Sequence, residues 1–489
     1  MTTLDQAAAA VASPNHPAAN VVSLKWLLRK ELWDHLHGKR LYLGGTMCIV
    51  LSLLAAFVRV HDYRQAWLER NAFVQRWAPS VEEQLERDET IQVENTRSVS
   101  PLTVLSVGLE PVVPFRFTST KEGLRFGETR GAQNSIDALF GYLDLTFVVS
   151  TLLSLLAVAV TFDSICGERA QGTLVLLLSY PIRRSTVLLA KLAGSMIVLA
   201  GCFIPAYLLA LLYVAISGVP LMSIGHWIAY GLLALLYVLT FATAGLAISA
   251  RVRRPADAAV ACLFAWAFLV CIVPRAVGLV VNQIKPVARN VEITLAEDEL
   301  VSQLKTDYAK KEQLAFDAYV AAGGDARAME DLMRSRREAL GQLRARRTEV
   351  LRRFWEKQSH EEESREELTR ALSLLSPAAV LHQAAAELSW TGFRQRSLFY
   401  EEARMYDEKI GRRLAESREV YYSGNARGVT NALVTHDNIK PFLIPFSGTW
   451  SSPQETLLAV VPPSLTIVAF ACFFFIAGAV AFTRMDVRA

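Results

Sequence analysis

Long apolar stretches dominate this chain, and they alternate with segments rich in charged residues. A helix needs about 20 apolar residues to cross the roughly 30 Å hydrocarbon core of a bilayer. Six stretches qualify as membrane spans, at residues 41–60, 142–162, 187–217, 227–250, 256–281 and 457–482. The third of them is long enough to tilt in the bilayer or to break at Pro205. The sequence therefore predicts an all-α polytopic membrane protein with six transmembrane helices.

Lys and Arg residues in the short connections predict which way the spans face, because such residues accumulate on the cytoplasmic side. The connection at 218–226, between the third and fourth spans, contains neither residue. All basic clusters fall on one side only if both termini are cytoplasmic, as we expect for a bacterial inner-membrane protein. The clusters are Lys25, Arg29, Lys30, Lys39 and Arg40; Arg169, Arg183 and Arg184; Arg251, Arg253 and Arg254; and Arg484 and Arg488.

This orientation places two long segments outside the cytoplasm, at residues 61–141 and 282–456. The first starts with a helical pattern and continues with prolines among β-type residues, which predicts a helix followed by an irregular or short-stranded part. The second is rich in Ala, Leu, Glu and Arg, with turns expected at Gly323-Gly324 and Ser376-Pro377. We expect a helical hairpin or small bundle, about 50–80 Å long, to project from the membrane.

The remaining segments have simpler patterns. Residues 1–21 are Ala-rich and predict a disordered tail, and residues 483–489 predict a short cytoplasmic tail. Residues 22–40 mix Leu and Trp with basic residues, which favours a helix lying in the cytoplasmic interface over a plain extension of the first span. Spans two to five, at 142–281, include a cytoplasmic loop at 163–186.

Several kinds of chemistry are disfavoured. The net charge of +4 is too small to indicate a nucleic-acid partner. The sequence contains no phosphate loop, no H-E-x-x-H and no G-x-S-x-G, so we predict no catalytic residues, metal ligands or cofactor in this chain. Asp144, Asp163, Lys191 and Arg275 lie near span ends, where we expect them to reach the interface. Ion-coupled transport is therefore disfavoured, and the energy for any work is expected to come from a partner.

The loop after the second span carries one specific pattern. It reads Gly-Glu-Arg at 167–169, Gly-Thr-Leu at 172–174, five apolar residues at 174–178 and Pro-Ile-Arg at 181–183. An ordinary positively charged loop would not explain five consecutive apolar residues outside the membrane. We therefore expect a short amphipathic helix whose apolar ridge is covered by another polypeptide.

This pattern resembles the type-2 family of ABC transporter permeases, in which the loop is a coupling helix that docks on a cytoplasmic ATPase. The acid often found at the position of Val175 is missing here. Scattered residues in 100–114, 134–147 and 375–400 resemble the subgroup with a large extracytoplasmic insert, which is similar to permeases of nitrous oxide reductase maturation and gliding motility. The ATPase-coupling residues implied by the resemblance are Glu168, Arg169, Gly172, Thr173, Leu174, Leu177, Leu178, Pro181 and Arg183.

The resemblance implies a permease subunit that couples ATP hydrolysis by a separate ATPase to export or to mechanical transmission. ATP and Mg²⁺ would then bind to the ATPase. The implied partners are that ATPase, a second permease copy or paralogue, membrane lipid and an extracytoplasmic protein. Two alternatives remain open: a membrane-anchored scaffold or receptor whose outer helical domain binds a protein, and a membrane enzyme acting on lipid, for which the sequence offers no candidate nucleophile.

Overall fold

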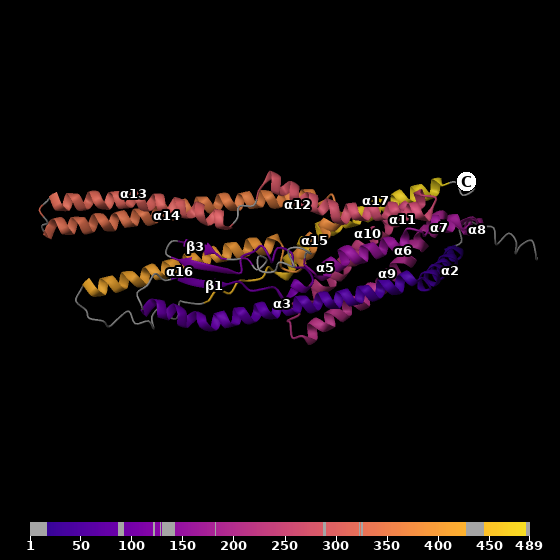
Figure 1. Ribbon diagram of the computed structural model, residues 1–489, viewed down its shortest axis with the longest axis horizontal. Coiled ribbons are helices and arrows are strands. Elements are labelled where there is room, and N and C mark those ends of the chain that lie inside the picture. Colours follow the sequence, from indigo (N-terminus) through magenta and orange to yellow (C-terminus); the bar gives the residue numbers. More distant parts are fainter. Residues whose placement is uncertain are drawn as a thin grey trace, which may run out of the picture.

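The computed structural model describes residues 17–86, 92–120, 123–127, 129, 142–180, 182–286, 290–321, 323, 326–426 and 445–485. The molecule is elongated, with a bundle of apolar helices at one end and a largely helical domain at the other (Figure 1). We call the latter part the distal domain. The residues predicted as a disordered tail lie outside the described part as far as residue 16, and so do residues 486–489 of the predicted C-terminal tail.

In the part of the chain that the structure describes, six helical segments are long and apolar enough to cross a membrane, which confirms the predicted number. Pro205 lies inside the third segment without ending it, and the second and fifth segments each contain a stretch of π-helix. The segments are α3 (Lys39–Glu86); α5 (Leu145–Phe147) with η3 (Val148–Leu153), α6 (Ser154–Thr161) and α7 (Cys166–Ala170); α9 (Arg184–Ile216); α10 (Ile224–Arg251); α11 (Pro255–Ala267) with η4 (Phe268–Ile272) and α12 (Val273–Ile284); and α17 (Pro453–Arg484).

The fourth span, α10, lies at the centre of the bundle and packs against α6, α9 and α17. Its large side chains Tyr230, Tyr237 and Phe241 are fully buried. Small residues let its neighbours come close, as is common between membrane helices. A Cβ atom on Gly478 of α17 would lie 3.1 Å from the Cα atom of Ala247, so α17 packs directly on the α10 backbone.

The N-terminal helix α2 (Pro17–Leu36) precedes α3, which continues from the first span far into the distal domain. At about 1.5 Å per residue, the 48 residues of α3 span about 72 Å. The helix therefore does not stop at residue 60, where the sequence pattern changes from apolar to polar.

The distal domain combines four further helices with a small sheet. The helices are α13 (Asn290–Ala321), α14 (Ala326–Ser373), α15 (Pro377–Leu388) and α16 (Phe393–Ala426). The antiparallel strands are β1 (Gln92–Thr96), β2 (Arg116–Thr120) and β3 (Gly123–Phe126), in that order across the sheet. This sheet is a small addition to an otherwise all-α fold.

Both turns predicted in the second polar segment separate helices. Gly323 lies between α13 and α14, which pack side by side as a hairpin (Figure 1). Ser376 caps α15, since its hydroxyl accepts hydrogen bonds from the backbone N–H groups of Ala378 and Ala379. Aromatic residues join α16 to the sheet: the ring of Phe117 on β2 lies 6.0 Å from that of Phe399.

Candidate functional site

The loop between the second and third spans consists of α7 and α8 (Thr173–Ser179). The Ser249 hydroxyl on α10 accepts hydrogen bonds from the backbone N–H groups of Ile165 (3.0 Å) and Cys166 (3.2 Å). These N–H groups at the start of α7 have no partner within their own helix, and the neighbouring helix provides one. Gly172 joins α7 to α8 at φ +75°, a conformation that favours glycine. A Cβ atom there would meet nothing within 4 Å, so the backbone conformation alone favours glycine.

The two faces of α8 have different surroundings. Leu174 is 0% and Leu177 is 7% exposed, and both belong to a cluster that includes Leu27 of α2 and Phe482 of α17. Leu178 packs against the same cluster. The expectation that another polypeptide covers the whole apolar ridge is therefore wrong for these leucines, which pack against their own chain.

The outer face of this loop remains apolar. Val175 is 50%, Leu176 is 67% and Tyr180 is 60% exposed. Helical geometry places Val175 and Leu176 opposite the buried pair Leu174 and Leu177. The surface on which a partner could dock consists of these three exposed side chains, and the buried leucines support it from behind.

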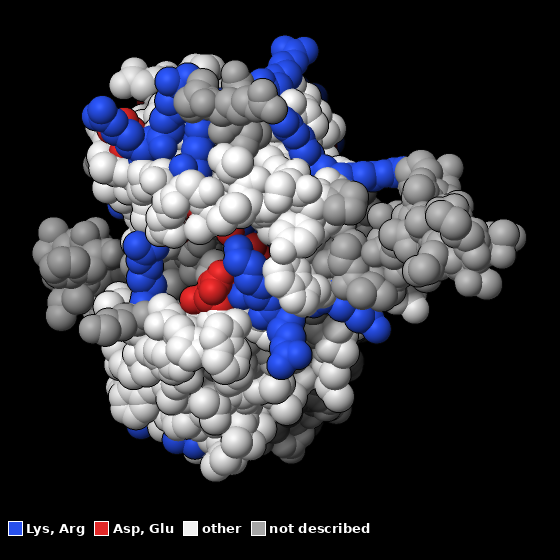
Figure 2. Space-filling view, turned by 90° about the vertical axis from the view of Figure 1, so that its right-hand side faces the viewer, with Lys and Arg blue, Asp and Glu red and all other residues white. Residues whose placement is uncertain are grey.

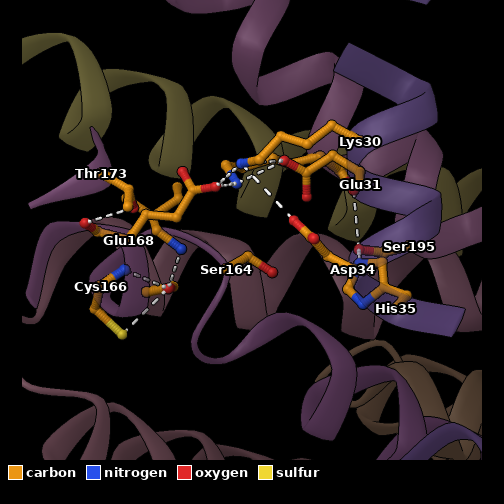
Figure 3. A network of polar contacts seen from close by, with 12 residues as sticks. Lys30, Glu31, Asp34, His35, Ser164, Cys166, Glu168, Thr173 and Ser195 are labelled. Atoms are coloured by element: carbon orange, nitrogen blue, oxygen red, sulfur yellow. Dashed lines mark hydrogen bonds and ion pairs between the residues drawn. The ribbon is translucent and has the colours of Figure 1, made fainter. Parts of the chain in front are cut away.

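A cluster of charges attaches α7 to two other helices (Figure 3). The Glu168 Oε1 atom lies 2.5 Å from the Nζ atom of Lys30 on α2 and 2.9 Å from that of Lys191 on α9. Lys191 Nζ also lies 2.9 Å from Glu31 Oε1. The Lys191 side chain is only 2% exposed, so the expectation that it reaches the interface is wrong. It stays buried because two carboxylates face it.

The protonation of α2 follows from these contacts. Burial by itself lowers the pKa of Lys30, but the hydrogen bond to Glu168 and the nearby carboxylates outweigh it and raise that pKa above its ordinary value. Burial lowers the pKa of His35, whose ring lies 3.4 Å from the Ser195 hydroxyl. Near neutral pH, Lys30 is therefore charged and His35 is neutral.

Comparison with known proteins identifies the family. The family described as "ABC-2 family transporter protein" matches residues 26–487. The chain belongs to this family. It is thus a multi-pass membrane protein of a family of ABC transporter permeases.

Two curated relatives of this ABC-2 permease carry the description "Probable ABC transporter permease protein NosY". The protein of Pseudomonas aeruginosa is 43% identical over 56 residues, which cover 12% of this chain and 20% of the relative. The protein of Stutzerimonas stutzeri is 31% identical over 134 residues, which cover 26% of this chain and 48% of the relative. The chain therefore spans at most about half the length of the curated relatives that it matches.

The remaining residues of the loop between the second and third spans lie around α7 and α8. The Thr173 hydroxyl donates to the Glu168 backbone oxygen at 3.1 Å and connects α8 to α7. Arg169 is half-buried, and Arg183 is exposed at the N-cap of α9. Pro181 lies outside the described residues. The neighbouring Arg184 donates to the backbone oxygens of Phe482, Thr483 and Met485, so a cation stabilises the C-terminus of α17.

Basic side chains surround the loop end of the ABC-2 permease. Figure 2 shows Lys and Arg spread over this face, while Asp and Glu gather in a hollow near its centre. The exposed basic residues here include Lys25, Arg29, Arg40, Arg183, Arg251, Arg253, Arg254 and Arg484.

Sequence reasoning missed Lys30, Glu31 and Lys191 as members of the site. The available signal was a lysine one to two turns inside an apolar helix, together with a glutamate in the preceding amphipathic segment. A buried lysine requires an opposite charge, but the sequence offers many carboxylates and does not indicate which one is near.

Proposed function

We propose that this permease couples ATP hydrolysis by a separate cytoplasmic ATPase to export or to mechanical transmission across the membrane. The observation that carries the proposal is the exposed apolar face formed by Val175 and Leu176 of α8 and by Tyr180, which follows the helix. The face lies at the end of the bundle where basic residues gather, which the positive-inside rule assigns to the cytoplasm. ATP and Mg²⁺ would bind to the ATPase, and the apolar face would sit in a groove on it.

The attachment of the loop suits it to pass on a displacement. Glu168 is bound to α2 and α9 through Lys30 and Lys191, while Ser249 ties the start of α7 to α10. Leu174 and Leu177 pack against side chains of α2 and α17. A movement of α8 imposed by the ATPase would therefore reach four helices at once.

We also propose that both termini lie on the cytoplasmic side of a bacterial inner membrane and that the distal domain lies outside the cytoplasm. A domain that extends so far from the bundle suits the movement of an extracytoplasmic protein, or the transfer of a substrate to it. A second permease copy or paralogue would complete the transporter, as is usual for the family.

The test replaces Leu176 with Asp and co-expresses the permease with its ATPase. The matched control is Leu314→Asp on α13, where the leucine is 69% exposed at the other end of the molecule. We expect Leu176→Asp to weaken co-purification of the ATPase and ATP turnover about tenfold or more, because a central apolar contact is replaced by a charge. Leu314→Asp should change neither quantity.

Unchanged ATPase binding and turnover in Leu176→Asp would contradict the coupling role and favour a membrane-anchored scaffold. Leu174→Asp is unsuitable for this test, since Leu174 is fully buried and its loss would disturb folding.

A further inference from the structure

The distal domain meets the spans in a group of contacts, which we call the collar. It comprises residues 100–109, the turn between α15 and α16 at 389–392, and the starts of three spans at 142–147, 226–230 and 450–456. The collar includes parts of the segments that resemble the insert-containing subgroup of permeases. The role proposed for the loop of α7 and α8 does not explain these contacts.

Trp390 stands in this collar in a backbone conformation that normally requires glycine. It follows the C-terminus of α15, where the Thr391 N–H donates to the Ala386 oxygen at 3.0 Å and the Trp390 N–H donates to the Glu387 oxygen at 3.2 Å. This is the Schellman arrangement, whose left-handed position is usually Gly. Trp390 occupies it with φ +54° while being only 3% exposed. A strained backbone retained under a large buried ring points to a role for that ring.

The Trp390 ring contacts the starts of two spans. Its centroid lies 4.9 Å from that of His226 on α10 and 5.6 Å from that of Trp450, which precedes α17 and is stacked at 20°. Its Nε1 atom donates to the Thr456 hydroxyl on α17 at 3.3 Å. One side chain of the distal domain thus contacts both the fourth and the sixth span.

The next residue connects the same turn to the second span. The Thr391 hydroxyl donates to the Ser106 oxygen at 3.2 Å, and the Leu109 N–H donates to the Thr391 oxygen at 2.8 Å. Residues 100–109 are in turn bound to the start of that span, because the Val107 N–H donates to Asp144 Oδ2 at 2.9 Å. A Cβ atom on Gly108 would lie 2.4 Å from the Thr391 hydroxyl, so the two segments are in direct contact.

The segment that precedes α17 is also fixed to α16. The Gln395 side chain donates to the Thr449 oxygen at 2.8 Å and accepts from the Ser451 N–H at 3.0 Å. The Glu402 carboxylate accepts from the Thr449 N–H at 2.9 Å. A shift of the start of α17 would therefore act on α16 through these hydrogen bonds.

We infer that Trp390 is the joint through which displacement of the fourth and sixth spans reaches the distal domain. It is a positioning residue: its ring transmits the position of α10 and α17 to the α15–α16 turn, and Thr391 extends the connection to the second span. The inference rests on the proposed function, since ATP must move the spans for the joint to carry anything.

The experiment measures hydrogen exchange by mass spectrometry on the permease–ATPase complex in nanodiscs, with and without ATP. The variant is Trp390→Gly, which removes the ring and leaves a residue suited to the backbone conformation. The control is Trp67→Ala on α3, which removes a ring that is 50% exposed. Peptides of α7–α8 report the coupling loop, and peptides of α13–α16 report the distal domain.

We expect ATP to change exchange in both regions of the wild type and of Trp67→Ala. In Trp390→Gly the change in α7–α8 should persist, while the change in α13–α16 should fall about fivefold or more. If Trp390→Gly does not fold, Thr456→Val, which removes the hydroxyl that accepts the hydrogen bond from Trp390 Nε1, is judged by the same criteria.

Distal changes that persist in Trp390→Gly would overturn the inference. A wild type that responds to ATP in α7–α8 but not in α13–α16 would overturn it while leaving the proposed function intact. No response in α7–α8 of the wild type would instead refute the proposed function, and the inference with it.

Discussion

Lys191 allows the charge cluster behind the loop of α7 and α8 to be tested quantitatively. Replacing it with Met keeps an unbranched apolar stem and removes the charge. Glu31, whose side chain is 7% exposed, would then lose its partner at 2.9 Å, leaving Lys30 at 3.9 Å. Glu168, 15% exposed, would keep Lys30 at 2.5 Å. The Glu31 carboxylate is thus left buried without a close partner, whereas the Glu168 carboxylate keeps one.

The size of the loss follows from this asymmetry. Removing one partner of a buried ion pair costs about 3–5 kcal/mol, most of which comes from the charge left behind. Since Lys30 still neutralises Glu168, we expect Lys191→Met to destabilise the protein by about 2–4 kcal/mol. The double variant Glu31→Gln with Lys191→Met removes one charge of each sign and should recover about half of that loss.

The assay is thermal unfolding in detergent, followed by the loss of helical circular dichroism. Arg352→Met on α14 serves as a control, since it removes a guanidinium that is 54% exposed and should leave the unfolding curve unchanged. The reasoning is refuted if Lys191→Met unfolds like the wild type, or if the double variant is less stable than the single one.

Three further predictions concern the loop and the distal domain. Leu174→Ala should cost about 2–5 kcal/mol of stability, because it empties a fully buried site, whereas Leu176→Ala should leave thermal unfolding unchanged and weaken ATPase co-purification. Gly172→Ala should lower the free energy of unfolding by about 1–2 kcal/mol and also lower ATP turnover, since alanine disfavours φ +75°. The control is Gly167→Ala, in ordinary helical surroundings, and equal effects of the two variants would contradict the argument. Burial raises the pKa of Glu366 to about 7, above its unfolded value, so the stability from its protonated form is present at pH 4 and lost as the pH rises through about 7. Glu366→Gln should therefore unfold at a higher temperature than the wild type at pH 8 and show no such gain at pH 4; a pH-independent difference would disprove this.

Several features could be predicted because they depend on residues near one another in the chain. A span of about 20 apolar residues is favourable in lipid wherever it occurs, so the number of spans follows from hydropathy alone. The predicted turns at Gly323 and at Ser376-Pro377 depend equally on local backbone chemistry. The short strands after α3 were also indicated by prolines among β-type residues, although their pairing was not.

The loop of α7 and α8 shows the limit of such prediction. Its pattern predicts a short amphipathic helix, which is present as α8. The pattern did not indicate that Leu174 and Leu177 face inward, because their cover comes from Leu27 and Phe482, in the first and last helices of the described chain.

The sequence by itself therefore determined the membrane class, the six spans and the location of the loop, since the transfer of an apolar segment into lipid is a property of that segment. Only the tertiary structure decided the partners of Lys191 and Trp390. Lys191 pairs with Glu31 across 160 residues, and Trp390 meets His226 on the fourth span and Trp450, which precedes the sixth. The role of a buried charge or ring depends on the residues that the fold places next to it. Because those residues are distant in the chain, the sequence does not identify them.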